Sequence, residues 1–518
     1  MFNRTLKFKY LFKLFIFVPL IFYFGKRSYI AFDEGFYALQ ARWILDKGNW
    51  TIPLWWDEYV LDRTIGLQYL IAKSQVIFGR NMFSAYLPTT IAAILMLFIT
   101  YKLHKEFFNE KYAIISPLIL STTYLWFDYS HLATQDIIYS CLVTIGVFSL
   151  IKIKAKENKL YILLFGIWIG LSFMMKTFLV FVPLFSLLPF IYLKKKLLFN
   201  KLFWFGLLIG FIPYLFWSFS INPYLDKNII FYLVEKFNIL SNKNTFTNPF
   251  YYYLWNIPLT FLPWSVFAII GIVHNFSESK EKKYILTIFP LILITIQSIF
   301  STKTPYYNLQ MSSILTLNTY AGIQCLFNSK RYKTIFIFFT SKIIPLFVFA
   351  LTFTYYFFFK NTSNFNFKEN TFLILGLLLF GLSWSLIRHK QSFQKTLITL
   401  IIGPYLLTSS LLQSGLFTDR SRELREKMED VSSINIVQNQ LINIDKRGIS
   451  NSLSQSKIIR ISLLTPNLGN GIENIDQLKK SELAWTTSES KEIKNNNNSY
   501  EVIYENDILK PWKLILKK

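Results

Sequence analysis

The sequence predicts a polytopic α-helical membrane protein. Of its 518 residues, 53% are hydrophobic and only 16% are charged, which is more apolar surface than a soluble protein of this length needs. Apolar windows of about 20 residues recur along the chain, and we count about thirteen candidate spans. Their centres lie near residues 17, 92, 119, 142, 166, 185, 210, 263, 292, 315, 346, 379 and 404.

The placement of basic residues supports this class and predicts an orientation. A net charge of +25 is compatible with a nucleic-acid partner, but the lysines and arginines cluster in alternate short loops. This is the positive-inside pattern of a membrane protein with a cytoplasmic N-terminus, and an odd number of spans places the C-terminus outside. The clusters lie at residues 4–13, 102–111, 152–159, 194–201, 280–283, 330–333 and 388–395. We therefore expect membrane lipids, and no nucleic acid, as partners.

The elements follow in order from the N-terminus. The first apolar segment lacks a small-residue cleavage site, so we expect a retained signal-anchor helix. The polar loop that follows, residues 26–80, contains amphipathic patterns at 34–45 and 64–78, which predict helices lying flat in the membrane interface. Two later apolar segments, 160–173 and 177–192, are short for separate spans.

A fall in hydrophobicity near Thr418 predicts a domain boundary. We expect a transmembrane domain over residues 1–417, including the first periplasmic loop, and a small soluble α/β domain over 418–518. Both Cys141 and Cys325 lie in apolar runs and predict neither a disulfide framework nor a zinc site. In the second domain the patterns predict helices at 420–430 and 473–480, strands at 457–464, 481–486 and 500–504, and a flexible tip at 495–498.

An acidic pair, Asp33-Glu34, stands just after the first apolar segment. Carboxylates at the edge of a bilayer are costly to leave partly desolvated, so they usually pair, bind a ligand or take part in chemistry. Asp136 is predicted on the same outer face, and two carboxylates there can serve general-base and orienting roles toward an acceptor hydroxyl. The structural alternatives are a solvated helix face for the pair and helix capping at Thr134 and Asp136.

Basic side chains are sparse on the predicted outer face, and three of them lie at informative positions. Arg63 follows Asp62, Lys176 lies between two apolar segments, and Lys303 begins the motif Lys-Thr-Pro-Tyr-Tyr. Isolated cations against the positive-inside trend indicate anion binding, and a guanidinium at the interface suits a phosphate. The alternatives are a surface ion pair for Asp62 and Arg63 and snorkelling for the two lysines.

The order and spacing of several short motifs resemble the protein mannosyltransferase and lipid A aminoarabinose transferase superfamily. These motifs lie at residues 32–38, 42–45, 48–53, 87–88, 132–136, 176, 248–253, 262–264 and 303–307. The resemblance covers about residues 26–322 and implies a GT-C glycosyltransferase fold. It also implies an inverting transfer of a hexose or pentose, such as aminoarabinose, from a polyprenyl-phosphate donor. The acceptor would be an envelope lipid, a lipopolysaccharide or a protein at the periplasmic face of the bacterial inner membrane.

The resemblance further implies roles for individual residues. The implied donor-phosphate ligands are Arg63, Lys176, Lys303 and Tyr307. The implied catalytic residues are Asp33, Glu34 and Asp136, and the further cavity candidates are Asp62, His131, Glu235 and Tyr306. No cofactor is expected to be required: members of the family sometimes bind a divalent cation, but the sequence offers no metal-ligand cluster. We expect a monomer.

The chain departs from the family pattern at several of these positions. Where the aminoarabinose transferases have Phe-Glu-Lys-Pro, this chain has Leu61-Asp62-Arg63-Thr64. Lys236 replaces a frequent histidine, and Gln310 replaces the proline that usually ends the Lys-x-Pro-x-Tyr motif. The donor sugar and acceptor therefore stay open. The rival class is a transporter or flippase of lipid-linked sugars, but the sequence lacks the inverted repeats and paired broken helices typical of transporters.

Overall fold

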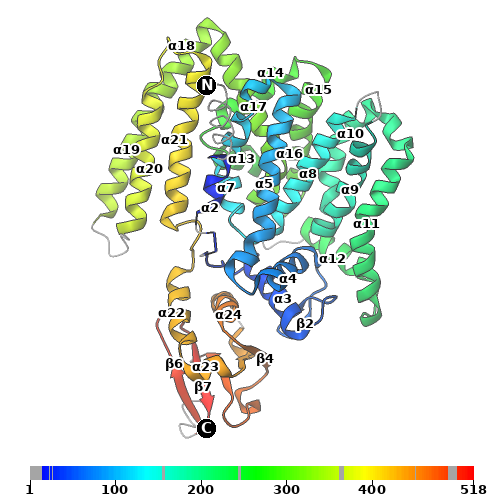
Figure 1. Ribbon diagram of the computed structural model, residues 1–518, viewed down its shortest axis with the longest axis vertical. Coiled ribbons are helices and arrows are strands. Elements are labelled where there is room, and N and C mark those ends of the chain that lie inside the picture. Colours follow the sequence, from blue (N-terminus) through cyan, green and yellow to red (C-terminus); the bar gives the residue numbers. More distant parts are fainter. Residues whose placement is uncertain are drawn as a thin grey trace, which may run out of the picture. The chain divides into compact units, whose positions relative to one another are not determined.

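Residues 15–22, 24–25, 27–153, 158–242, 247–360, 367–449, 451–487 and 499–518 are described in a computed structural model (Figure 1). They form two compact units. The membrane unit consists of Met1–Phe24, Asp62–Thr64 and Leu87–Thr418, and the second unit consists of Gly25–Leu61, Ile65–Tyr86 and Asp419–Lys518. The first loop thus belongs mostly to the second unit. The domain boundaries expected from the sequence, 1–417 and 418–518, remain a proposal.

The membrane unit is built from helices (Figure 1). Its first half contains α2 (Val18–Ile21), most of α5 (Met82–Phe107), α6 (Ile115–Ser121), α7 (Tyr124–Tyr129), α8 (Gln135–Lys152), α9 (Lys159–Lys176), α10 (Phe181–Leu193), α11 (Lys201–Ile221) and α12 (Ile229–Asn242). Its second half contains α13 (Tyr252–Thr260), α14 (Ser265–Phe276), α15 (Lys280–Lys282), α16 (Phe289–Ile299), α17 (Ser312–Asn328), α18 (Lys330–Phe338), α19 (Ile344–Phe359), α20 (Phe367–Ser385) and α21 (Phe393–Ser414).

The helices confirm a multi-pass membrane protein but not the expected number of spans. By length and composition, seven helical segments of the described residues could cross a membrane when Lys159–Leu193 is counted as one segment, or eight if the bent pair α13 and α14 forms one span. The expected thirteen are not confirmed. Some expected spans are interrupted: the one near residue 119 is divided into α6 and α7, and α13 meets α14 at 115°. Most of the expected signal-anchor segment lies outside the described residues.

The two short apolar segments form separate helices that run in opposite directions. Lys176, at the end of α9, binds Asp136 at the start of α8, with 2.8 Å between Nζ and Oδ1. Lys194, just after α10, donates to the carbonyls of Leu150 and Ile153 at the far end of α8. The C-terminal end of α9 thus lies at the start of α8, and the C-terminal end of α10 lies at the end of α8. The chain therefore reverses its direction between α9 and α10, at the 3₁₀ turn Thr177–Val180.

Glycines bring α9 and α11 into backbone contact. A Cβ atom on Gly166 would lie 2.3 Å from the Phe203 carbonyl oxygen, and one on Gly170 would lie 2.2 Å from the Gly210 carbonyl carbon. Small residues spaced four apart allow such close approach between membrane helices. Because residue numbers rise together along the contact, α9 and α11 run parallel. This packing fixes the helix that ends at Lys176.

The second unit combines segments from both ends of the chain. Its first-loop elements are α3 (Glu34–Lys47), the hairpin of β1 (Leu54–Trp55) and β2 (Glu58–Tyr59), and α4 (Gly66–Phe78). The C-terminal helices are α22 (Arg422–Ser432), α23 (Asn435–Asn439) and α24 (Ser452–Leu464). The C-terminal strands are β3 (Ile442–Asp445), β4 (Leu468–Ile472), β5 (Leu483–Thr487), β6 (Tyr500–Tyr504) and β7 (Trp512–Lys517), in the spatial order β4-β3-β5-β7-β6. Strand β3 pairs parallel with β4 and β5, and β7 pairs antiparallel with β5 and β6.

The structure confirms part of the prediction for the C-terminal tail and corrects the rest. Helix α22 and strands β5 and β6 lie where the sequence predicts them. The predicted strand at 457–464 is wrong, because these residues belong to α24. The predicted helix at 473–480 is also wrong, since only the short 3₁₀ turn Ile475–Gln477 forms there. The expected flexible tip at 495–498 lies outside the described residues.

The two juxtamembrane helices exist, but their burial differs from the expectation. Helix α3 is buried around most of its circumference, so protein rather than a lipid surface covers it. Its Leu39 and Trp43 share one hydrophobic core with Leu424 and Met428 of α22. In helix α4, Leu67 is buried by protein, contrary to the expected lipid-facing position. Ile77 and Phe78 at its C-terminal end are exposed, as an interfacial helix requires.

Candidate functional site

A hollow in the membrane unit brings several of the predicted site residues together. It is lined by charged, aromatic and amide side chains from α8, α9, α12, α16 and the segment before α17. The lining residues are Asp136, Tyr139, Lys176, Leu179, Val182, Phe237, Gln297, Phe300, Thr302, Tyr306, Tyr307 and Gln310. Four of the sequence-predicted residues, Asp136, Lys176, Tyr306 and Tyr307, therefore share one cavity.

The central pair of this cavity is Asp136 with Lys176. Only 9% of the Asp136 side chain and 14% of the Lys176 side chain are exposed, so the 2.8 Å ion pair is largely shielded from water. Asp136 lies in the first turn of α8 and Lys176 in the last turn of α9, where helix dipoles favour an anion and a cation respectively. The Lys176 ammonium also lies 5.1 Å from the ring centroid of Tyr306.

The backbone is strained immediately beside Lys176. Thr177 has φ 48°, a conformation in which a β-branched residue is uncommon, and it begins the turn that reverses the chain. Residues held in such conformations cost about 1–3 kcal/mol each and concentrate at functional sites. The capping alternative for Thr134 is not supported, because its side chain makes no capping hydrogen bond to the described start of α8.

A second group of charges surrounds Asp62. Arg63 donates two hydrogen bonds to this carboxylate, at 2.8 and 2.9 Å, and Lys236 of α12 lies 3.0 Å from its Oδ2. Burial alone would raise the pKa of Asp62, but the hydrogen bonds and charges of Arg63 and Lys236 outweigh it and hold that pKa well below its usual range. Asp62 thus carries its negative charge throughout the neutral range and balances part of the local positive charge.

Two contacts connect this charged group to the cavity. The Thr64 hydroxyl donates to the Met174 carbonyl at 2.7 Å, two residues before Lys176. On α12, Phe237 follows Lys236 directly, lines the cavity and packs its ring against Phe300 at 5.8 Å. The threonine that replaces the family proline at residue 64 therefore makes a hydrogen bond that a proline could not donate.

Lys303 lies beside the cavity rather than in its lining. Its ammonium donates to the Asn248 carbonyl at 2.9 Å, and the Asn248 amide donates back to the Lys303 carbonyl at 2.9 Å. The neighbouring Thr302 lines the cavity and forms an isolated bridge with Thr247. Burial lowers the pKa of Lys303 from its ordinary value. The loop before α13 thus fixes this lysine at the edge of the hollow.

Two further candidates do not line the cavity. His131 is buried, and its Nε2 lies 3.0 Å from the Pro19 carbonyl oxygen. Glu235 is exposed on α12. Sequence reasoning did not place three other residues in the site: Tyr139, Gln297 and Gln310, all of which line the hollow. The signal that could have found Gln297 is a lone amide within an apolar helix, which usually indicates a polar partner.

The acidic pair belongs to the second unit and is described there alone. Asp33 is exposed and has φ 56°, which is strained for a non-glycine residue. Glu34 is fully buried, and its Oε2 accepts a hydrogen bond from the Ile30 amide at 2.8 Å. Arg27 lies nearby, 5.0 Å from the Tyr86 ring centroid, and burial lowers its pKa to about 10, so it stays charged at neutral pH. The two carboxylates therefore have opposite environments.

A metal centre finds no support in these groups. Among the described residues, no group of three or more His, Cys, Asp or Glu side chains is arranged to hold a metal ion. The carboxylate of Asp62 already binds two cationic side chains. The expectation that a divalent cation is dispensable stays a prediction.

Comparisons with known proteins identify the fold. Residues 62–218 match the family described as dolichyl-phosphate-mannose-protein mannosyltransferase. ArnT from Cupriavidus metallidurans bound to undecaprenyl phosphate superposes with a TM-score of 0.78 over 97% of both chains, at 13% identity. Its apo form gives a TM-score of 0.77 over 99% of this chain and 98% of that one. This chain has the GT-C fold.

Sequence relatives support the same family resemblance. The undecaprenyl phosphate-α-4-amino-4-deoxy-L-arabinose arabinosyl transferase of Wigglesworthia glossinidia brevipalpis is 27% identical over 53% of this chain and 51% of its own length. A Proteus mirabilis protein with the same activity in its name is 24% identical over 58% and 56%. The chain spans about half the length of these curated relatives. The predicted resemblance to the mannosyltransferase and aminoarabinose transferase superfamily is thus confirmed, while the activity of this GT-C protein is a separate question.

Proposed function

We propose that this GT-C protein transfers a sugar from a polyprenyl-phosphate donor to an envelope acceptor outside the cytoplasmic membrane. The observation that carries the proposal is the shielded hollow around Lys176. Lys303 is fixed beside it, and Arg63 precedes Thr64, whose hydroxyl bonds to the Met174 carbonyl. A lipid phosphate is a good leaving group when preorganised cations stabilise its developing charge. The undecaprenyl phosphate bound by the structural neighbour from Cupriavidus metallidurans has this chemistry.

The reaction assigned to the site is an inverting displacement. The acceptor hydroxyl oxygen attacks the anomeric carbon of the donor on the face opposite the phosphate. The bond from this carbon to the phosphate oxygen breaks, and its electron pair leaves with the polyprenyl phosphate. Asp33, exposed on the second unit, accepts the acceptor proton as general base. Glu34 is too deeply buried for that task and instead supports the loop through its bond to the Ile30 amide.

The phosphate roles fall to the cations of the membrane unit. Lys176 supplies a point charge inside the hollow, and Asp136 holds its ammonium in place. Arg63 can bind two phosphate oxygens at once because its guanidinium is a planar fork, and it would exchange Asp62 for the phosphate. Tyr306 and Tyr307 line the same hollow and can contact the sugar or phosphate.

An apolar groove supports a polyprenyl substrate. Its lining residues come mainly from α13, α14, η6 (Lys283–Ile288) and α16. Its lining includes Tyr253, whose hydroxyl donates to the carbonyl of Thr304, next to Lys303. The apolar side chains of Ile269, Val273 and Leu291 also line it. An isoprenoid chain in this groove would bury apolar surface while its phosphate stays near the cations.

The orientation completes the proposal. We place the N-terminus in the cytoplasm and the C-terminal residues in the periplasm of a bacterial cell, because basic loops alternate in that sense. Reporter fusions after Lys195 and Lys518 should then give opposite signals. Matching signals from the two fusions would contradict this topology.

The test of the activity uses the purified full-length protein with a panel of radiolabelled polyprenyl-phosphate sugars and an envelope lipid extract. We expect label to move from the polyprenyl carrier to an extract lipid, with release of free polyprenyl phosphate. The Lys303→Ala variant should lose more in rate than in donor affinity, since charge grows in the transition state. A transporter would instead move intact lipid-linked sugar across vesicles and leave all label on the carrier. That result would overturn the proposal.

A further inference from the structure

A buried arginine joins the first-loop helix to the C-terminal part of the second unit. Arg42 of α3 is 3% exposed, and its guanidinium donates to backbone carbonyls that end α24. The bonds reach the oxygens of Ser462 at 2.8 Å, Leu463 at 3.3 Å, Thr465 at 2.6 Å and Pro466 at 2.9 Å. Carbonyls in the last turn of a helix have no partner within it, and a cation there also favours the helix dipole. One side chain thus fixes α3 to α24.

A second contact lies at the opposite end of α3, beside the acidic pair. Gly35 follows Glu34 and packs so closely on α24 that an added Cβ would lie 2.6 Å from Ile459 Cγ2 and 2.9 Å from the Ile30 carbonyl oxygen. No larger residue fits without movement of one of these neighbours. The first turn of α3, which carries Glu34, therefore rests directly on α24.

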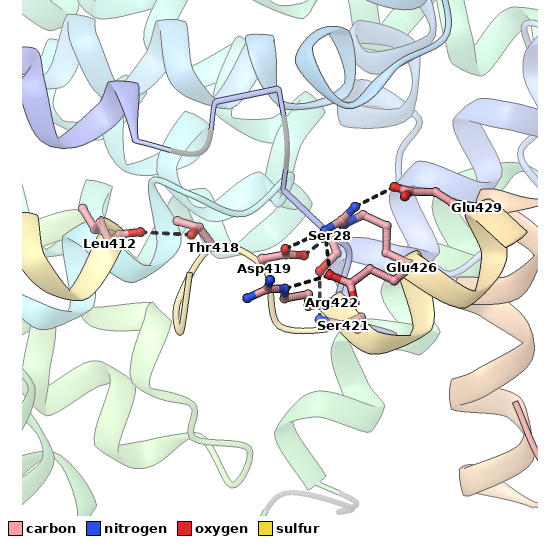
Figure 2. A network of polar contacts seen from close by, with 9 residues as sticks. Ser28, Leu412, Thr418, Asp419, Ser421, Arg422, Glu426 and Glu429 are labelled. Atoms are coloured by element: carbon pink, nitrogen blue, oxygen red, sulfur yellow. Dashed lines mark hydrogen bonds and ion pairs between the residues drawn. The ribbon is translucent and has the colours of Figure 1, made fainter. Parts of the chain in front are cut away.

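The segment before the acidic pair is held by C-terminal residues as well. The Ser421 amide donates to the Ser28 hydroxyl at 2.8 Å (Figure 2). The Ser421 hydroxyl donates to the Tyr29 carbonyl, also at 2.8 Å. Arg460 of α24 donates to the same Ser421 hydroxyl at 2.9 Å. Asp419 forms an isolated bridge with Ser28, and its carboxylate pairs with Arg425 at 3.0 Å. Contacts to the C-terminal part thus flank Asp33 and Glu34 on both sides.

We propose that residues 419–518 are a positioning module for the acidic loop and that Arg42 is its principal positioning residue. The inference rests on the proposed role of Asp33 as general base. The strained backbone at Asp33 requires support from its surroundings, and the flanking contacts supply it. The C-terminal part therefore acts on the chemical step through α3 and the segment at Ser28, without itself touching the substrate. A small displacement of a catalytic group can cost a large factor in rate.

The test compares Arg42→Gln with Arg80→Gln in the full-length protein. Arg80 is the matched control, because it pairs with Asp46, as Arg42 does, but, among the described residues, it makes no hydrogen bond or ion pair with α24 or with the C-terminal strands. We expect Arg42→Gln to speed hydrogen–deuterium exchange at residues 28–36 by about tenfold and to lower kcat by about tenfold, with the donor KM little changed. Arg80→Gln should leave both measurements within about twofold of wild type.

A second pair of variants keeps the inference testable if Arg42→Gln does not fold. Gly35→Ala should speed exchange at residues 28–36 and lower kcat, and adding Ile459→Ala should restore part of both, because it removes the methyl group that the new Cβ meets. Exchange that rises equally throughout the second unit, or stays unchanged at 28–36, would overturn the positioning role. If wild-type protein transfers no sugar, the proposed function fails, while the exchange data still decide this inference.

Discussion

The charged candidate site residues of the two units differ in their surroundings. In the membrane unit the candidate cations are held by protein oxygens: Lys176 by Asp136 and Lys303 by the Asn248 carbonyl. In the second unit the candidate base, Asp33, is exposed on a strained backbone. Cations that stabilise a leaving group work best when they are fixed before the reaction, whereas a base must be accessible to a substrate proton. The difference therefore matches the roles proposed for the two groups.

The largest expected effect comes from the exposed carboxylate. Asp33→Asn should lower kcat by about 10²–10⁴-fold, because it removes the base while keeping nearly the same shape. Radiolabel transfer by purified protein measures this loss. Asp57→Asn is the matched control, since Asp57 is another carboxylate of this unit with positive φ, and it should lose no more than about twofold. A fully active Asp33→Asn variant would show that another residue is the general base, and the proposed difference in role between the two units would then be wrong.

The next effect concerns the buried ion pair. Lys176→Met should lower kcat by about 10²–10³-fold because a fixed positive charge is lost from the hollow. Asp136→Asn should cost less, and the double variant should be no worse than Lys176→Met alone, since both residues act through one ammonium. The control is Lys152→Met, which breaks a 2.6 Å pair with Glu106 at the other end of α8. Additive losses would show that Asp136 acts independently of Lys176.

The pH dependence of transfer tests the role of Lys303. Since burial lowers its pKa, Lys303 loses its charge at a lower pH than an ordinary lysine, and activity should decline on the alkaline side as the ammonium deprotonates. In Lys303→Arg the guanidinium stays charged, so this alkaline limb should move upward by about one pH unit or more. If activity declines at the same alkaline pH in the wild type and in Lys303→Arg, a group other than Lys303 causes the decline.

The smallest expected effect is at Thr64. Thr64→Val removes the hydroxyl that donates to the Met174 carbonyl and should cost about 1 kcal/mol, or roughly fivefold in donor affinity, as the segment with Arg63 loosens. Thr316→Val is the control, because its hydroxyl donates within α17, to the Ser313 carbonyl. Equal losses of donor affinity in the two variants would show that the Thr64 hydroxyl has no specific role at the phosphate site.

The class of the protein and most of its candidate residues could be predicted from the sequence. Apolar windows and alternate basic loops predict a multi-pass membrane protein, because the bilayer constrains length and charge along the chain. Asp136 and Lys176 were recognisable individually, since charges next to apolar helices are costly and therefore informative. The family resemblance was also readable, because its motifs are short but ordered.

Which of these residues contact one another depends on the fold and could not be predicted from the sequence. The pairs of Lys236 with Asp62 and Asn248 with Lys303 join segments far apart in sequence, and no local pattern encodes such a contact. Helix α24 shows the same limit: its isoleucines at 458, 459 and 461 favour a strand locally, yet Asn451 caps a helix there and α3 packs on it. Local preferences are worth tenths of a kcal/mol per residue, so burial against distant segments overrides them.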